Sequence, residues 1–142
     1  MTDLRRISAW LAPRLFWAAC ALAGAFALWS RSAPACEICV EDHVAATYDY
    51  AVVAKAGAAG RKVLFVAVRG KDAAAPASEA AVRKALIAVA GVDRASVRTS
   101  AFPSAASFAW SAKRISSADL LRTVNGGLGG SGLTLVALKV IG

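Results

Sequence analysis

The sequence predicts an α+β domain of ferredoxin-like plan: a four-stranded antiparallel sheet with two helices on one face, preceded by an N-terminal helix. Two observations support this fold class. Compact runs of β-branched residues alternate with amphipathic helical stripes over residues 62–141, in the order β-α-β-β-α-β. An alanine-rich segment with apolar residues at helical spacing comes before them. A split βαβ order of this kind places all four strands in one sheet.

The first two elements are a helix and a buried strand. Apolar residues such as Val40, Val44 and Tyr48 recur every three or four positions from residue 36 to about residue 56, which predicts one continuous helix. A glycine-containing segment, residues 57–60, ends it. The following run, Lys62–Val68, is rich in β-branched and aromatic residues and is typical of a strand covered on both faces.

A second helix and two short strands follow. The helix begins at Pro76, with Ser78 as its candidate cap, and its apolar stripe continues to Gly91. The next two segments show partial alternation of apolar and polar residues and are expected to be strands joined by a turn near Pro103-Ser104. These two segments are residues 92–99 and 107–112.

The last third of the chain predicts one more helix and one more strand. Ser116 begins an amphipathic helix that is expected to stop at Asn125-Gly126-Gly127. The glycine-rich residues 125–132 are interpreted as a flexible connector, because they lack the Lys-Ser/Thr ending of a phosphate-binding loop. Residues 133–141 form the final strand.

The first 35 residues have the features of a cleavable secretory signal. Arginines come first, an apolar run of fifteen residues from Leu15 to Trp29 follows, and small residues precede Cys36. The run is shorter than the roughly twenty residues that a spanning helix needs. Ala33 and Ala35 suit a signal peptidase, which predicts cleavage after Ala35. The protein is expected to be exported, periplasmic or secreted, with membrane attachment only if Cys36 is lipidated or the signal stays uncleaved.

Composition limits the remaining organisation and the partners. Residues 1–35 are assigned to the signal peptide, residues 36–60 to the N-terminal helix with its CxxC motif, and residues 61–142 to one ferredoxin-like domain. The chain carries 17 Lys and Arg against 9 Asp and Glu, a net charge of +8. These cations are scattered singly or in pairs (Arg61-Lys62, Arg83-Lys84, Lys113-Arg114) without interleaved aromatic residues. This pattern favours a solvated surface, so no nucleic acid partner is expected.

Residues 62–141 resemble a heavy-metal-associated domain. The resemblance lies in the element order and lengths, in the Gly91-Val92 step followed by Val97, and in a leucine-bearing second helix that leads to a glycine. It implies a ferredoxin-like fold and metal binding. Domains of that family carry their CxxC in the loop after the first strand, whereas the corresponding loop here, residues 69–74, contains no cysteine. The family's metal site therefore cannot be transferred to this loop.

The soft ligands of the mature chain are Cys36, Cys39 and the single histidine, His43. If the predicted helix reaches back to Cys36, these positions are spaced i, i+3, i+7 and lie along one stripe. Two thiolates and an imidazole suit a soft metal ion, either Cu(I) or Zn(II). A helix N-terminus would also favour the thiolate form. The residues thus predict an exported protein that binds or delivers a soft metal ion, with copper preferred, and an envelope protein is the partner that delivery would involve.

Two alternatives use the same residues. Cys36 could act as the attacking thiolate of a thiol-disulfide exchange protein and Cys39 as the resolving thiol, although a pair at a chain end is expected to lack a substrate groove. The cysteines could instead form a passive disulfide in an interaction domain. No Ser-His-Asp set or paired-carboxylate site is visible, so the sequence favours a binding protein over an enzyme.

Overall fold

The computed structural model describes residues 39–142, and the predicted signal, its cleavage junction and Cys36 lie outside them. The elements, in chain order, are α2 (Val40–Thr47), α3 (Tyr50–Ala58), β1 (Lys62–Arg69), α4 (Pro76–Ala88), η1 (Arg94–Ser96), β2 (Arg98–Ala101), β3 (Ser104–Trp110), α5 (Ser117–Leu128), η2 (Gly129–Ser131) and β4 (Thr134–Ile141). The strands form one antiparallel sheet in the order β2-β3-β1-β4. The predicted ferredoxin-like α+β fold is confirmed.

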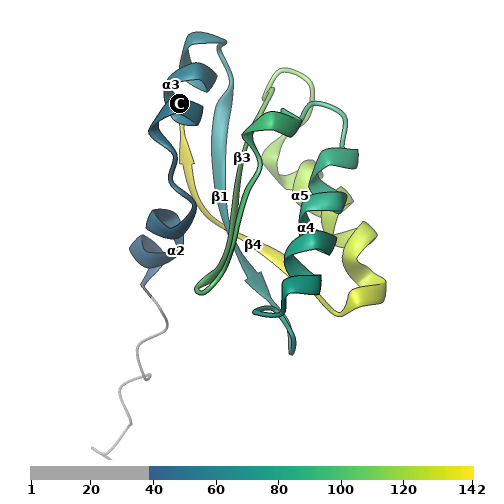
Figure 1. The fold of residues 1–142 in the computed structure, drawn as a ribbon. Helices are drawn as coiled ribbons and strands as arrows, with labels where there is room; N and C mark the ends of the chain where they lie inside the picture. The colour runs from purple at the N-terminus through teal and green to yellow at the C-terminus, as the bar shows by residue number, and fades with distance from the viewer. Residues whose placement is uncertain (1–38) are drawn as a thin grey trace, which may run out of the picture. The chain divides into compact units, whose positions relative to one another are not determined.

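The described residues form three layers, with α2 and α3 on one face of the sheet and α4 and α5 on the other (Figure 1). Strand β1 lies in the middle, and its residues 63–68 are all buried. Because successive side chains of a strand point to opposite faces, Leu64 and Val66 join the α4–α5 core while Val63 and Phe65 join the α2–α3 core. The uniformly apolar sequence of β1 follows from this double coverage.

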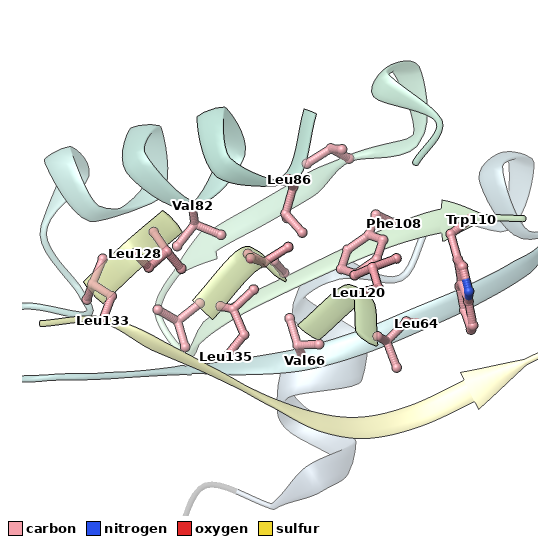
Figure 2. Close-up of a cluster of buried hydrophobic side chains, with 14 residues drawn as sticks. Leu64, Val66, Val82, Leu86, Phe108, Trp110, Leu120, Leu128, Leu133 and Leu135 are labelled. Atoms are coloured by element: carbon pink, nitrogen blue, oxygen red, sulfur yellow. The ribbon is translucent and has the colours of Figure 1, made fainter. Parts of the chain in front are cut away.

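The larger core lies between the sheet and the helices α4 and α5 (Figure 2). Val82 and Leu86 are four residues apart on α4, and three α5 residues repeat the same spacing, so each helix presents one apolar stripe to the strands. The α5 stripe consists of Leu120, Val124 and Leu128. Burial of each such side chain stabilises the fold by about 1.5–3 kcal/mol.

The N-terminal segment contains two helices, so the prediction of one continuous helix is wrong. The break falls at Tyr48-Asp49, where Asp49 caps α3 by accepting hydrogen bonds from the backbone amides of Ala51 (2.9 Å) and Val52 (3.2 Å). An aspartate forms such a cap more favourably than it continues a helix. On the preceding turn, the buried hydroxyl of Ser107 in β3 donates to the Thr47 carbonyl at 2.7 Å. This bond fixes the end of α2 on the sheet.

Two other boundaries differ from the sequence predictions. Helix α4 begins after Ala75, and Ser78 is not its cap, because its buried hydroxyl donates to the Asp72 carbonyl at 2.6 Å. The predicted strand over residues 92–99 is interrupted by the short helix η1, at whose start Asp93 accepts a hydrogen bond from the Ala95 amide at 3.1 Å. Only residues 98–101 belong to β2, and β3 begins earlier than expected, at Ser104.

The predicted connector over residues 125–132 is also wrong, since α5 continues through it to Leu128 and η2 follows. Buried Leu128 extends the apolar stripe, which explains why the helix passes through two glycines. Asn125 lies in this last part of α5, where its side-chain amide donates to the Leu135 carbonyl at 3.1 Å and its carbonyl oxygen accepts from the Leu135 amide at 2.8 Å. Helix α5 is thereby bonded directly to the edge strand β4.

Strand β4 forms one edge of the sheet and is less covered than β1. Its register against β1 shifts between Phe65 and Val66, which leaves one extra residue in β4. Val136 and Val140 are each 45% exposed. Within residues 39–142, no helix has both the length and the apolar character needed to cross a bilayer.

Candidate metal site at the start of α2

Cys39 is the N-cap residue of α2 and precedes the first helical residue, Val40. Its thiol is free and exposed. Its carbonyl oxygen accepts hydrogen bonds from the backbone amides of Asp42 (2.9 Å) and His43 (3.4 Å), which are the first bonds of the helix. The continuous helical stripe assumed for residues 36, 39 and 43 therefore does not extend to Cys39, whose ψ of 148° is extended. The thiol instead sits at the entrance to the helix.

His43 lies on the side of α2 that faces the sheet and is only 7% exposed. Its ring nitrogen Nδ1 is 3.4 Å from the Cys39 carbonyl oxygen, and the buried hydroxyl of Thr47 donates to the His43 carbonyl one turn later. An imidazole that donates from Nδ1 to a carbonyl keeps Nε2 as its lone-pair nitrogen. Nε2 is then the ring atom left for a ligand.

The expected ligand set is only partly described. Cys39 precedes α2 and His43 lies within it, and the two are linked by the bond from the His43 amide to the Cys39 carbonyl, whereas Cys36 lies outside the described residues. Between residues 39 and 142, no three His, Cys, Asp or Glu side chains gather closely enough to hold a metal ion. The first turn of α2 also carries Glu41 and Asp42, both exposed. Their carboxylates lower the local potential beside Cys39 and attract cations.

Sequence reasoning missed a groove that begins immediately after Cys39. It has a volume of about 340 Å³ and lies between α2 and the edge strand β4. One wall contains Val40 and Val44 of α2 and, four residues on, Tyr48 just after the helix. Lys139 of β4 stands on the other side. The Tyr48 ring stacks on Phe65 of β1, with ring centres 6.2 Å apart. The expectation that a thiol pair at this end of the chain lacks a substrate groove stays a prediction, because Cys39 does not line this groove.

Only one wall of the groove could be predicted from the sequence. The repeat of apolar residues that predicts the helix is visible in the sequence, but the sequence does not show that Val40 and Tyr48 remain nearly half exposed. Nothing in the sequence places Lys139, some ninety positions later, opposite them. The arrangement presents an apolar surface with a cation on one side and the Glu41 carboxylate on the other, which suits docking of a partner surface close to the thiol.

Comparison with known proteins gives no relative: no protein-family model, curated protein or solved structure matches this chain.

Proposed function

We propose that this protein is an exported, periplasmic binding or delivery protein for a soft metal ion, with Cu(I) preferred over Zn(II). Cys36 and Cys39 supply the thiolate ligands and His43 supplies an imidazole nitrogen. The observation that carries the proposal is the position of Cys39, a free and exposed thiol at the N-cap of α2, three residues after Cys36. The resemblance of residues 62–141 to heavy-metal-associated domains supports the same class of function.

The location of Cys39 suits a metal ligand, because its sulfur stands exposed at the N-cap of α2. Thiolates are soft donors that select Cu(I) and Zn(II) over hard ions. Because the thiol is exposed, an incoming partner can reach a metal ion bound to it. Accessibility of this kind is needed for delivery, whereas a storage site would be closed.

His43 completes the proposed ligand set from the buried side of the helix. Its Nδ1 contact with the Cys39 carbonyl couples the ring to the cysteine's own backbone. In metal sites, a hydrogen bond from the second ring nitrogen fixes the tautomer and orients the ligating nitrogen. Nε2 is then the ring atom that would bind a metal ion held by Cys39.

The test is a Cu(I) titration of the reduced, exported protein against a chromophoric Cu(I) chelator. Cys39→Ser should lose uptake, and His43→Gln should bind more weakly. Asp42→Asn is the matched control, because it removes a neighbouring exposed charge from the same turn without removing a soft ligand. Equal and negligible uptake by the unmodified protein and Cys39→Ser would overturn the proposal. Circular dichroism of each variant separates ligand loss from unfolding.

The groove between α2 and β4 favours one second candidate, thiol-disulfide exchange. In that reaction the Cys36 thiolate attacks a substrate disulfide, one substrate thiolate leaves, and Cys39 then attacks the mixed disulfide. The products are an oxidised Cys36–Cys39 pair and a substrate with two thiols, so electrons and protons balance. An insulin reduction assay and a measured reduction potential distinguish it. A pair that is inert to exchange but binds Cu(I) leaves metal binding as the function, and a pair that does neither is a passive disulfide.

A further inference from the structure

A polar pocket lies where three connections meet beside the start of β1. The connection from α3 to β1 contributes Arg61, the connection from α4 to η1 contributes Gly91, and the connection from β3 to α5 contributes Ser111, Lys113 and Arg114. The pocket has a volume of about 350 Å³. Along the chain, α2 and α3 lie between Cys39 and the pocket residue Arg61.

The pocket is lined by three cations and no acidic residue. Arg61 bonds the Asp93 carboxylate at 2.7 Å, but Asp93 does not line the pocket. The other oxygen of that carboxylate accepts the Ala95 amide. Within residues 39–142, no ion pair is formed by Lys113 or Arg114. The pocket therefore keeps an excess of positive charge, and a concave surface concentrates the field of such charges.

The backbone leaves space for a ligand between these side chains. Gly60 and Gly91 have positive φ angles of 63° and 101°, a conformation that disfavours larger residues. A Cβ atom placed on Gly60 would meet nothing within 4 Å, so the pocket is open on that side. The Ser111 hydroxyl adds a neutral donor to the same lining.

The cationic connections are held in position by backbone hydrogen bonds. The Ser111 amide donates to the Gly91 carbonyl at 3.0 Å, which joins two of the three connections. The Arg114 amide donates to the Ser111 carbonyl at 2.9 Å and closes a turn around the pocket. The third connection is anchored by the Arg61 amide, which donates to the Ala56 carbonyl at 2.9 Å. The backbone of the three connections is thus fixed before a ligand arrives, while the exposed side chains of Lys113 and Arg114 would order around it.

We infer that this pocket binds a phosphate group. Arginine and lysine with a hydroxyl donor are the side chains that recognise phosphate oxygens, and two or more cations can share one such group. The fold brings Arg61 together with Lys113 and Arg114, which lie more than fifty positions later in the sequence. In the sequence alone, these basic residues look scattered. A bound anion would also relieve the mutual repulsion of these cations, so it should raise the stability of the fold. The phosphate could belong to a soluble molecule or to an anionic lipid headgroup.

The experiment uses the whole exported protein labelled with ¹⁵N, titrated with pyrophosphate at constant ionic strength set by chloride. The amide signals of Gly60, Gly91 and Ser111 should shift in a saturable way. The variant Lys113→Gln/Arg114→Gln should bind roughly tenfold more weakly, because it loses two charge-assisted contacts. Its matched control is Arg83→Gln/Lys84→Gln, an exposed basic pair on α4 that does not line the pocket.

A parallel arm measures co-sedimentation with phosphatidylglycerol vesicles, with phosphatidylcholine vesicles as the uncharged comparison. Binding to vesicles that is lost in Lys113→Gln/Arg114→Gln and kept in the control identifies a lipid headgroup as the phosphate source. A pyrophosphate response without vesicle binding identifies a soluble source. The inference is overturned if neither probe produces a saturable response. It is also overturned if both double variants weaken binding equally, since net charge alone would then explain the effect.

Discussion

Replacing Ser107 by alanine removes one oxygen atom from beneath α2 and should destabilise the fold measurably. The Ser107 side chain is only 2% exposed, and its hydroxyl donates to the Thr47 carbonyl at 2.7 Å. Thr47 is the last residue of α2, where helical carbonyls have no amide partner within the helix. The variant leaves this carbonyl buried without the donor, which costs roughly 1–3 kcal/mol. The cavity from one lost oxygen adds little.

The assay is urea unfolding followed by tryptophan fluorescence. Small proteins have m-values of roughly 1–3 kcal/mol per molar urea, so a loss of about 2 kcal/mol lowers the midpoint by about 1 M. Ser131→Ala is the matched control. The Ser131 hydroxyl also donates at 2.7 Å to the last carbonyl of a helix, that of Leu128, but Ser131 is exposed. Water replaces its hydroxyl, so the change should stay within about 0.5 kcal/mol.

Equal midpoints for Ser107→Ala and Ser131→Ala would refute the reasoning, because burial is the difference between the two sites. A second readout tests the location of the effect. Amide hydrogen exchange in α2 should accelerate in Ser107→Ala while exchange in α4 changes only as much as global stability does. Exchange that accelerates uniformly would show that this bond does not specifically hold the N-terminal layer.

Three further outcomes are expected. The backbone amide of Val52 and the Arg98 guanidinium lower the pKa of Asp49 below its usual 3.8. The ionised carboxylate therefore stabilises the fold fully above pH 3.8, and this contribution is lost as pH falls through the lower folded pKa. The free energy of unfolding, measured as a function of pH, should fall less steeply in acid for Asp49→Asn. Asn125→Ala should lower the free energy of unfolding by roughly 1–3 kcal/mol in urea melts, since the outward backbone groups of β4 lose both partners. After cleavage at the proposed site, Trp110 is the only tryptophan in the sequence. Its 2% exposure predicts blue-shifted fluorescence that moves to longer wavelength on unfolding. Long-wavelength fluorescence from the folded protein would contradict this burial.

The element order could be predicted because it depends on local periodicity. Strand β1 and helix α4 are visible as runs and stripes that need no knowledge of distant residues. The break between α2 and α3 could not be located in this way. Asp49 caps α3 and also binds Arg98, 49 positions later, with its second oxygen 2.9 Å from a guanidinium nitrogen. The contact with Arg98 supports the cap, and the helix therefore breaks at Asp49 although the apolar spacing continues on both sides.

The candidate sites also combine features that local spacing predicts with features that depend on the tertiary fold. The neighbourhood of Cys39 and His43 follows from a spacing of four, although the burial of the imidazole does not, because it depends on where the sheet lies. The groove needs Lys139 beside α2, and the basic pocket needs Arg61 beside Lys113. Each of these pairings is produced by strand order, which brings together connections that a linear pattern shows as isolated charges.

Asn125 affects whether molecules of this protein can associate through the edge strand β4. Its side-chain amide presents a donor and an acceptor to the outward N–H and C=O of Leu135, as a neighbouring strand would. A strand of a second molecule could pair with β4 only by displacing the Asn125 side chain from Leu135. It would also encounter the β-bulge and the Lys139 side chain, both of which disfavour edge pairing. Extension of one sheet into the next is the route by which exposed edges assemble into fibres. Helix α5 thus covers the outward edge of β4 at Leu135, which opposes pairing with a strand of a second molecule there.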